Sequence, residues 1–245
     1  MQHQLREEGI RKWRATKCPL LTQEHVKKHL VWARAHQHWT VEDWKCVVWS
    51  DECAVQKDSN TIGYWVFQRQ NRKEKYAPQN VRMKAKYGIL SQMIWACFLG
   101  DKLGPIVFIS GSVNQDVYIE LLRMDFEPFV EALAANGETN LEFQHDNASS
   151  HTAKKTAEFL KVLVRRHGLT LMDRPVNSPD LSPIENLGAH LKLELRQRFP
   201  DTATLKGSRE TIKAALQERL HKIWWDIGEE VLNDMVNGMP KLWEK

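Results

Sequence analysis

The sequence lacks the marks of membrane, secreted and disulfide-stabilised proteins. No apolar run approaches the roughly 18 residues that a membrane span needs. The N-terminal segment MQHQLREEGIRKWR has none of the apolar core of a signal peptide. Cysteine is scarce, and the four thiols show no C-x-x-C spacing, which argues against a zinc site and a disulfide framework. These absences predict a soluble protein that stays inside the cell.

Composition and length indicate an ordinary globular chain. Of the 245 residues, 42% are hydrophobic and 27% are charged. These values are close to the averages of soluble domains, so a mainly disordered chain and a collagen-like chain are both excluded. At about 100–200 residues per domain, the length allows one large domain or two small ones. Ten tryptophans are many for this length, and we expect most of them in the core or at its rim.

Positive charge is concentrated in one stretch, although the net charge of the whole chain is only +4. Residues 64–87 contain a single acid, Glu74, and seven cationic side chains. The seven are Arg69, Arg72, Lys73, Lys75, Arg82, Lys84 and Lys86. Such a stretch can neutralise DNA phosphates, whereas the simpler interpretation is a solvated hairpin.

Apolar patterns predict strands and helices along most of the chain. Runs of apolar and β-branched residues predict strands at 46–49, 61–68, 88–98, 106–110, 141–144 and 169–173. Helical periodicity predicts a helix that begins after Thr22 as a plausible N-cap, with Val26, Leu30 and Ala33 on one stripe. Further helices are predicted at 114–127 until Pro128 disturbs it, at 153–166 with a stop at Gly168, from 183 to about 199, and in the C-terminal third. This order implies an α/β fold, a mixed β-sheet flanked by helices, over residues 41–245. Residues 1–40 form a short helical N-terminal appendage.

Three acidic residues occupy positions that are typical of functional sites. Asp51 and Asp146 are each expected at the end of an apolar strand, and Glu185 in the first turn of a helix. If the three carboxylates converge, they form a hard anionic site of the kind that Mg²⁺ or Mn²⁺ prefers. Two such ions about 3.5–4 Å apart can cleave a phosphodiester.

Each acid also has a structural interpretation. Asp51 could end its strand in a turn, and Asp146-Asn147 is a turn-forming pair. Ser182-Pro183-Ile184-Glu185 reads as a capping box, with serine as the N-cap and glutamate at the third helical position. Capping and metal binding by Glu185 are compatible.

The segments around these acids resemble the three catalytic blocks of mariner-type DDE transposases. They are WSDE (49–52), HDNASSHTA (145–153) and SPDLSPIENL (178–187), in that order. The stretches 20–52 and 104–122 are similar to the same superfamily, so the likeness covers roughly residues 10–240.

The resemblance implies an RNase H-like fold and a transposase catalytic domain, a metal-dependent endonuclease and strand transferase. Carried over position by position, it makes Asp51, Asp146 and Glu185 the catalytic and metal-binding triad, with two Mg²⁺ or Mn²⁺ ions. In that chemistry a metal-activated water hydrolyses the strand at the transposon end, and the freed 3′-hydroxyl attacks target DNA. The implied partners are transposon-end and target DNA and, on DNA, a second copy of the chain. The implied location is the nucleus of a eukaryotic host, or otherwise the cytoplasm.

Neighbouring residues take supporting roles in this interpretation. Asn147 and His151 would hold Asp146 and its metal in place, or serve the fold alone. A histidine-based zinc site lacks an evident third ligand. The cationic stretch 64–87 matches in position the loop that, in mariner relatives, reaches across a dimer to clamp the partner and its DNA.

The sequence departs from the mariner pattern in three places. Thirty-eight residues separate Asp146 from Glu185, which suggests a divergent lineage. Gly188 stands where members usually carry an aromatic residue, and glycine inside a helix costs about 1 kcal/mol. Only residues 9–21 resemble the end of the usual helix-turn-helix region, so we expect a fragment, a truncated copy or a mis-started product. Two alternatives stay open: another RNase H-like nuclease or integrase, and a domesticated DNA-binding protein without catalysis.

Overall fold

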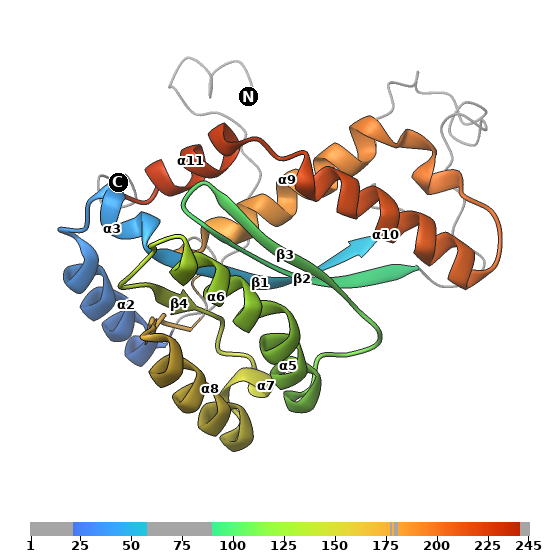
Figure 1. Cartoon of the computed structure of the whole chain (residues 1–245). Helices are drawn as coiled ribbons and strands as arrows, with labels where there is room; N and C mark the ends of the chain where they lie inside the picture. Colours follow the sequence, from blue (N-terminus) through green and yellow to red (C-terminus); the bar gives the residue numbers. More distant parts are fainter. Residues whose placement is uncertain (1–21, 58–89, 177, 179–180, 241–245) are drawn as a thin grey trace, which may run out of the picture.

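The computed structural model describes residues 22–57, 90–176, 178 and 181–240. Its centre is a mixed sheet with the strand order β3-β2-β1-β4-β5 within the described residues (Figure 1). β1, β2 and β3 pair antiparallel, while β4 and β5 continue the sheet parallel to β1. The strands are β1 (Val47–Gln56), β2 (Ser91–Leu99), β3 (Lys102–Ile109), β4 (Glu142–Gln144) and β5 (Thr170–Leu171). The prediction of a mixed sheet flanked by helices is therefore confirmed.

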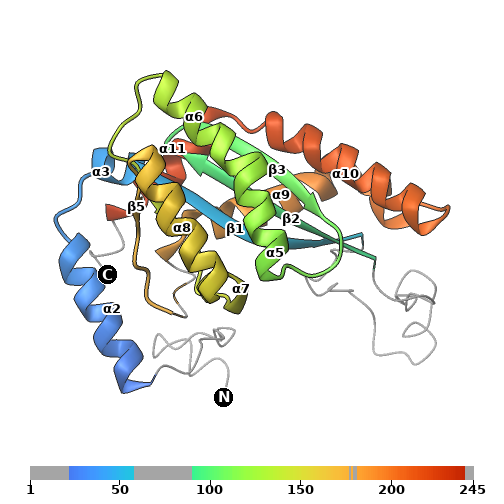
Figure 2. The same ribbon diagram turned by 60° about the horizontal axis from the view of Figure 1, so that its bottom comes forward.

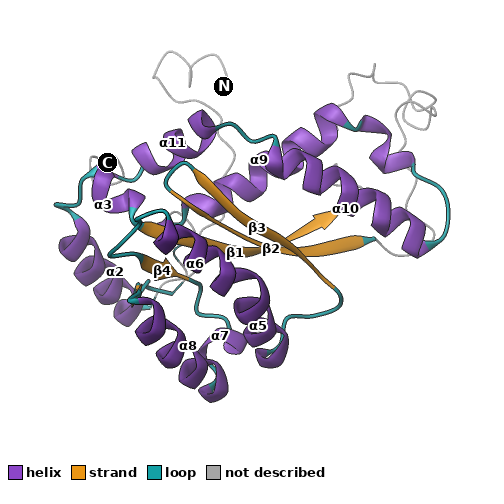
Figure 3. Ribbon diagram, in the orientation of Figure 1, coloured by secondary structure: helices purple, strands orange, loops and turns teal. Residues whose placement is uncertain are grey.

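Helices cover both faces of this sheet (Figures 2 and 3). One layer is formed by α5 (Gln115–Leu121), the π-helical turn η2 (Leu122–Phe126), α6 (Glu127–Ala135), α7 (Ser149–Thr152) and α8 (Lys154–His167). The other is formed by α9 (Pro183–Arg198), the 3₁₀ turn η4 (Pro200–Thr204), α10 (Arg209–Trp225) and α11 (Glu229–Asn237). Separate clusters of buried apolar side chains hold each layer to the sheet. No helix in the described part of the chain has both the length and the apolar character needed to cross a membrane.

The central strand β1 is longer than its sequence predicts. Its first residues, Val47 to Ser50, are fully buried because both faces of the sheet are covered. The strand was expected to end at Ser50-Asp51, but it continues to Gln56. The reason is the antiparallel ladder with β2, which pairs Asp51 with Ala96 and runs on to Gln56 and Ser91. Asp51 therefore lies inside a strand.

Local signals placed most helix ends correctly. α8 stops at Gly168, whose φ of +64° is the left-handed conformation of a C-cap. α9 spans the predicted range and stays continuous through Gly188. The disturbance expected at Pro128 occurs just before it, as the π-helical turn, and the helix then continues to Ala135. The predicted strand 61–68 and part of the strand 88–98 lie outside the described residues.

The helix α2 (Gln23–His36) is attached to the sheet by a row of contacting aromatic rings. Thr22 caps this helix as its sequence suggests. Val26 and Leu30 of its apolar stripe are exposed, whereas Trp32 is buried. Ring contacts of 4.1 to 5.9 Å link Trp32, His36, Trp39, Trp44 and Trp49, through α3 (Val41–Lys45) and into β1. We call this row the aromatic ladder.

Candidate active site

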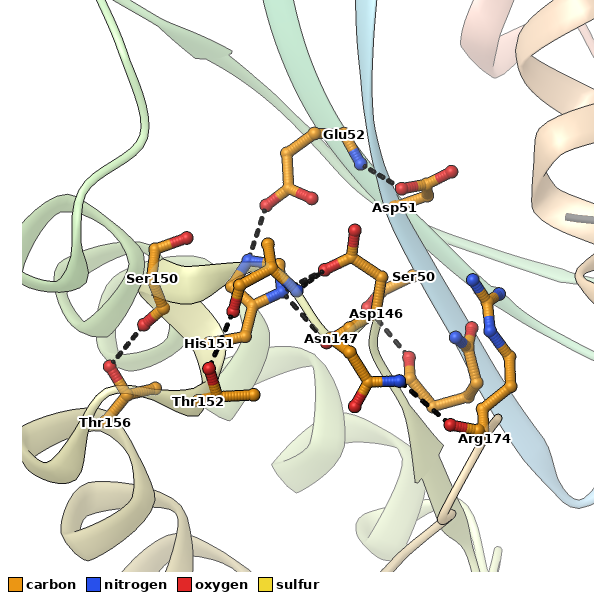
Figure 4. A network of polar contacts seen from close by, with 12 residues as sticks. Ser50, Asp51, Glu52, Asp146, Asn147, Ser150, His151, Thr152, Thr156 and Arg174 are labelled. Carbon is orange, nitrogen blue, oxygen red and sulfur yellow. Dashed lines mark hydrogen bonds and ion pairs between the residues drawn. The ribbon is translucent and has the colours of Figure 1, made fainter. Parts of the chain in front are cut away.

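Two aspartates lie side by side where β1 passes the end of β4. The parallel register pairs Trp49 with Gln144, and Asp51 and Asp146 each follow two residues later. Since side chains two apart share a face of a strand, the register directs both carboxylates to one region. Figure 4 shows them close together, beyond the point where β4 stops pairing.

Helix α9 brings the third predicted acid to the same region. Ile184 and Leu187 are buried against the sheet and fix the first turn of the helix. Glu185, between them, is exposed and lines one cavity together with Asp51. Gly188 allows this close approach, since a Cβ atom there would lie 3.3 Å from Cys53 Sγ on β1.

The charges at Asp51 show that the three acids influence one another. Burial raises the pKa of Asp51 from 3.8 to about 7, and the negative charges of Glu52, Glu185 and Asp146 add to this shift. The Glu52 backbone N–H donates to Asp51 Oδ1 at 2.8 Å and offsets part of it. A concentration of negative charge is the electrostatic condition that favours cation binding.

Asp146 is held differently, by a buried histidine. His151 Nδ1 lies 2.5 Å from Asp146 Oδ1, and His151 Nε2 lies 3.1 Å from Glu52 Oε1 (Figure 4). Burial alone would lower the pKa of His151, but the hydrogen bonds to Asp146 and Glu52 outweigh it and raise this pKa to about 9. The same contact with His151 helps to lower the pKa of Asp146 against the effect of burial. His151 is therefore an imidazolium that bridges two carboxylates.

Other side chains fix this histidine. The Tyr118 ring stacks on His151 with the ring centroids 3.8 Å apart. Burial and the His151 charge lower the pKa of His145 to about 4, so this second histidine is neutral. Asn147 is exposed and donates from Nδ2 to the backbone oxygen of Arg174 at 2.8 Å, which ties the loop to the segment after β5.

Glu52 is a site residue that the sequence reasoning missed. Its carboxylate, that of Asp146 and the ring of His151 bring their polar atoms within 4.8 Å of one another, although His151 as an imidazolium cannot itself ligate a metal ion. Strand alternation turns Glu52 to the face opposite Asp51, where α7 lies, but no sequence signal singles it out, because only the fold brings His151 to it.

The turn predicted at Asp146 and the capping box predicted at Glu185 have different outcomes. Asp146 does form a turn, because its Oδ1 accepts the N–H of Ala148 at 2.9 Å. The capping box at Glu185 is wrong: Ser182 makes no side-chain cap bond, and its buried Oγ has no hydrogen-bond partner within the described residues. The extended backbone of Ser182 instead brings its carbonyl oxygen to the N–H of Glu185 at 3.2 Å.

The predicted DNA-binding side chains lie outside the described residues. All seven cations fall within 58–89. Among the described residues, Asp51 and Glu185 share a cavity, while Asp146 is bonded to His151, which also contacts Glu52; the role of the three acids as a catalytic triad stays a prediction.

Comparison with known proteins gives consistent matches. A family model described as "DDE superfamily endonuclease" matches residues 46–206. The transposase of the transposable element Tcb1 from Caenorhabditis briggsae is 30% identical over 98% of this chain and 81% of its own length. The Tc1 transposase of Caenorhabditis elegans is 27% identical over the same shares.

Solved structures match the fold as well. The Mos1 transposase paired-end complex with the left transposon end superposes with a TM-score of 0.69 at 19% identity, over 99% of this chain and 67% of that one. The catalytic domain of Mos1 mariner transposase gives a TM-score of 0.57 at 17% identity, over 94% and 95%. The fold is therefore RNase H-like.

Proposed function

We propose that Asp51, Asp146 and Glu185 are the metal-binding carboxylates of this chain, which belongs to the DDE superfamily endonucleases and is a transposase catalytic domain. The observation that carries the proposal is geometric: the β1–β4 register directs Asp51 and Asp146 to one region, and Asp51 and Glu185 line one cavity. A carboxyl group on β1 responds to charges from the β4 end and from α9, two segments far apart in the sequence. Nothing in the packing of the sheet requires three acids at one edge, whereas a divalent cation does.

The donor set fits two Mg²⁺ or Mn²⁺ ions. Carboxylate oxygens are the ligands that these hard cations prefer. Solved structures of the Mos1 mariner paired-end complex include one with Mn and one with Mg. Bound at this site, such ions would activate a water and stabilise the leaving oxygen during strand cleavage. The three carboxylates would hold the ions.

His151, Glu52 and Asn147 act as positioning residues in this scheme. The N–H groups of His151 hold the Asp146 and Glu52 carboxylates in place. The exposed amide of Asn147 keeps the loop after Asp146 anchored to Arg174. Such partners around metal ligands usually affect affinity or activity 10–100-fold.

DNA is the partner, and we extend this to transposon-end and target DNA bound by a homodimer in a eukaryotic nucleus. The support is indirect: Mos1, whose fold this chain shares, is seen as a paired-end complex with a transposon end. The cationic stretch 64–87 supplies charge that suits DNA phosphates.

A single substitution tests the role of Glu185. Glu185→Gln keeps size and shape but removes the charge, so Mg²⁺-dependent nicking of supercoiled DNA should fall more than about a hundredfold, as losing several kcal/mol of metal-ion stabilisation implies. The melting temperature should not change, because Ser182 makes no capping bond that depends on this residue.

The matched control is Glu194→Gln on the same helix α9, which should nick DNA like the wild type. Near-normal nicking by Glu185→Gln would refute the metal-binding role. A wild-type chain that binds DNA without nicking it in Mg²⁺ or Mn²⁺ would support the non-catalytic alternative.

A further inference from the structure

A cavity of about 310 Å³ lies directly beside the acids, between β1, β2 and the helices α9 and α10. Its floor is apolar and mostly buried, made by Cys53, Ala54, Ile94, Ile184, Leu191 and Trp224. The Trp224 indole N–H already donates to the Gly104 carbonyl oxygen at 2.9 Å, so it leaves only carbon surface for a ligand. The floor therefore suits an apolar body without polar groups on its faces.

Gly188 keeps this space open. It lines the cavity from α9, and a Cβ atom there would already lie 3.3 Å from Cys53 Sγ. A larger side chain at 188 would enter the cavity. The volume is at the small end of the roughly 300–1,000 Å³ of ligand sites, so the cavity has room for one small ring system.

The charged side chains that line the cavity indicate which chemical groups the bound ring carries. The Asp51 and Glu185 carboxylates, which hold metal in the proposed function, border the cavity. Lys192 is the single cation among the described lining residues, four positions after Gly188 and so on the same face of α9. Metal-bound carboxylates on one side and an ammonium on the other suit the phosphates on either side of one nucleotide.

We propose that this cavity binds one unpaired nucleobase of the DNA strand that lies at the acids, with Lys192 facing a neighbouring phosphate. The inference rests on the proposed function and names the part of the substrate that the cavity takes. The free energies of stacking and of base-pair opening limit which bases the cavity can take. Stacking a base on apolar side chains contributes about 1–3 kcal/mol, whereas pulling one from a duplex costs a few kcal/mol. The cavity therefore takes bases that are already unpaired, at a frayed end or beside a nick.

The test measures affinity by fluorescence anisotropy, in Ca²⁺, which takes the same oxygen ligands. The probes are a labelled oligodeoxyadenosine strand and a strand of equal length made only of abasic sites. Both carry the same phosphates and differ only in the bases. Wild-type protein should bind the strand with bases about tenfold more tightly, the equivalent of about 1.4 kcal/mol.

Filling the cavity should remove that difference. Gly188→Trp should bind both strands alike, with little change for the abasic one, while Ala134→Trp on exposed α6 should keep the wild-type difference. Gly188→Leu is the second variant if tryptophan prevents folding, which melting curves detect. Equal binding of both strands by the wild type, or a difference that persists in a folded Gly188 variant, would overturn the proposal.

Failure of the metal site is a separate result. Glu185→Gln should lose nicking but keep the tenfold preference for the strand with bases, because the floor of the cavity is unchanged. A variant that loses nicking but keeps this preference tests the metal site alone, and a Gly188 variant tests the cavity alone. Lys192→Met should weaken binding of both strands and flatten the slope of log affinity against log salt by about 0.7, the value for one phosphate contact on a single strand; an unchanged slope would remove Lys192 from the proposal.

Discussion

The pKa values of the two aspartates, Asp51 in β1 and Asp146 just after β4, are shifted in opposite directions. Burial and neighbouring acids raise the pKa of Asp51, while His151 and the Ala148 N–H help to lower that of Asp146. At neutral pH without metal, Asp146 is ionised and already partnered, and Asp51 is half protonated. Asp51 is therefore the residue whose proton must leave when a cation binds.

This difference predicts a pH-dependent stability for the metal-free protein. Because the pKa of Asp51 is about 7 in the folded state and near 3.8 otherwise, the folded chain binds more protons between these values. The contribution of Asp51 to the free energy of unfolding should fall as pH rises from about 4 to about 7. Urea unfolding of the wild type and of Asp51→Asn across this pH range measures the contribution of Asp51. The variant should lack that part of the fall, and Asp101→Asn should retain it; parallel curves for wild type and Asp51→Asn would contradict the prediction.

The contribution of His151 to the free energy of unfolding also falls as pH rises, but over a higher pH range. Its pKa of about 9 lies above the ordinary 6.5, so its stabilising contribution is complete below about pH 6.5 and is lost as pH rises through 9. His151→Asn should lower the free energy of unfolding by about 3 kcal/mol at pH 6, and the difference from wild type should shrink toward pH 9.5. Exposed His221→Asn serves as the control, and a gap that is constant with pH would argue for lost packing alone.

At the scale of elements, β2 and β3 meet at one glycine with no spare room. A Cβ atom at Gly104 would lie 2.4 Å from Cys97 Sγ, 2.9 Å from the Cys97 carbonyl oxygen and 3.0 Å from the Phe129 ring. Gly104→Ala should therefore destabilise the protein by about 1–3 kcal/mol, measured by urea unfolding. Adding Cys97→Ala removes the thiol but leaves the carbonyl, so the double variant should recover only part of the loss. Full wild-type stability of Gly104→Ala would show that β3 moves without cost.

Local sequence signals predicted the elements that depend on nearby residues. Thr22, Gly168 and Pro183 set helix ends through contacts within a few positions, and all three ends are where the sequence places them. The extent of β1 depends on pairing with β2, some forty residues away, and its polar residues Asp51-Glu52 hide the strand from any apolar pattern.

The residues of the candidate site also divide into those that local sequence predicts and those that only the fold brings together. Asp51, Asp146 and Glu185 could be picked from their positions beside strands and a helix start, and by resemblance to a family. Glu52 could not, because its importance comes from His151, which only the fold brings to it. The capping box is wrong because the Ser182 hydroxyl, although buried at the start of α9, makes no bond to the first turn of the helix.

At the scale of the whole molecule, the acids Asp51, Asp146 and Glu185 gather where β1 passes the end of β4 and the start of α9. DNA must therefore be attracted by positive charge elsewhere on the chain. The cationic stretch 64–87 is the candidate. Replacing Arg72, Lys73 and Lys75 by glutamine should flatten the slope of log affinity against log salt by up to about 2.7, since each phosphate contact contributes about 0.9. Filter binding or anisotropy over a salt series measures it. The same replacement of Lys27, Lys28 and Lys222 should change the slope less; equal changes would mean that the stretch has no special role.

The aromatic ladder makes the chain report optically on its own N-terminal helix. The Trp44 ring lies 5.9 Å from Trp32, 4.6 Å from Trp39 and 5.9 Å from Trp49, two residues before Asp51. Indole rings this close share their electronic excitation, which gives a paired positive and negative band in circular dichroism. Release of α2 would break the row at Trp32 and weaken that band, while Trp49 would remain buried in the sheet. A change in the spectrum on adding DNA would therefore show whether the helix before the sheet moves when the edge of the sheet is engaged.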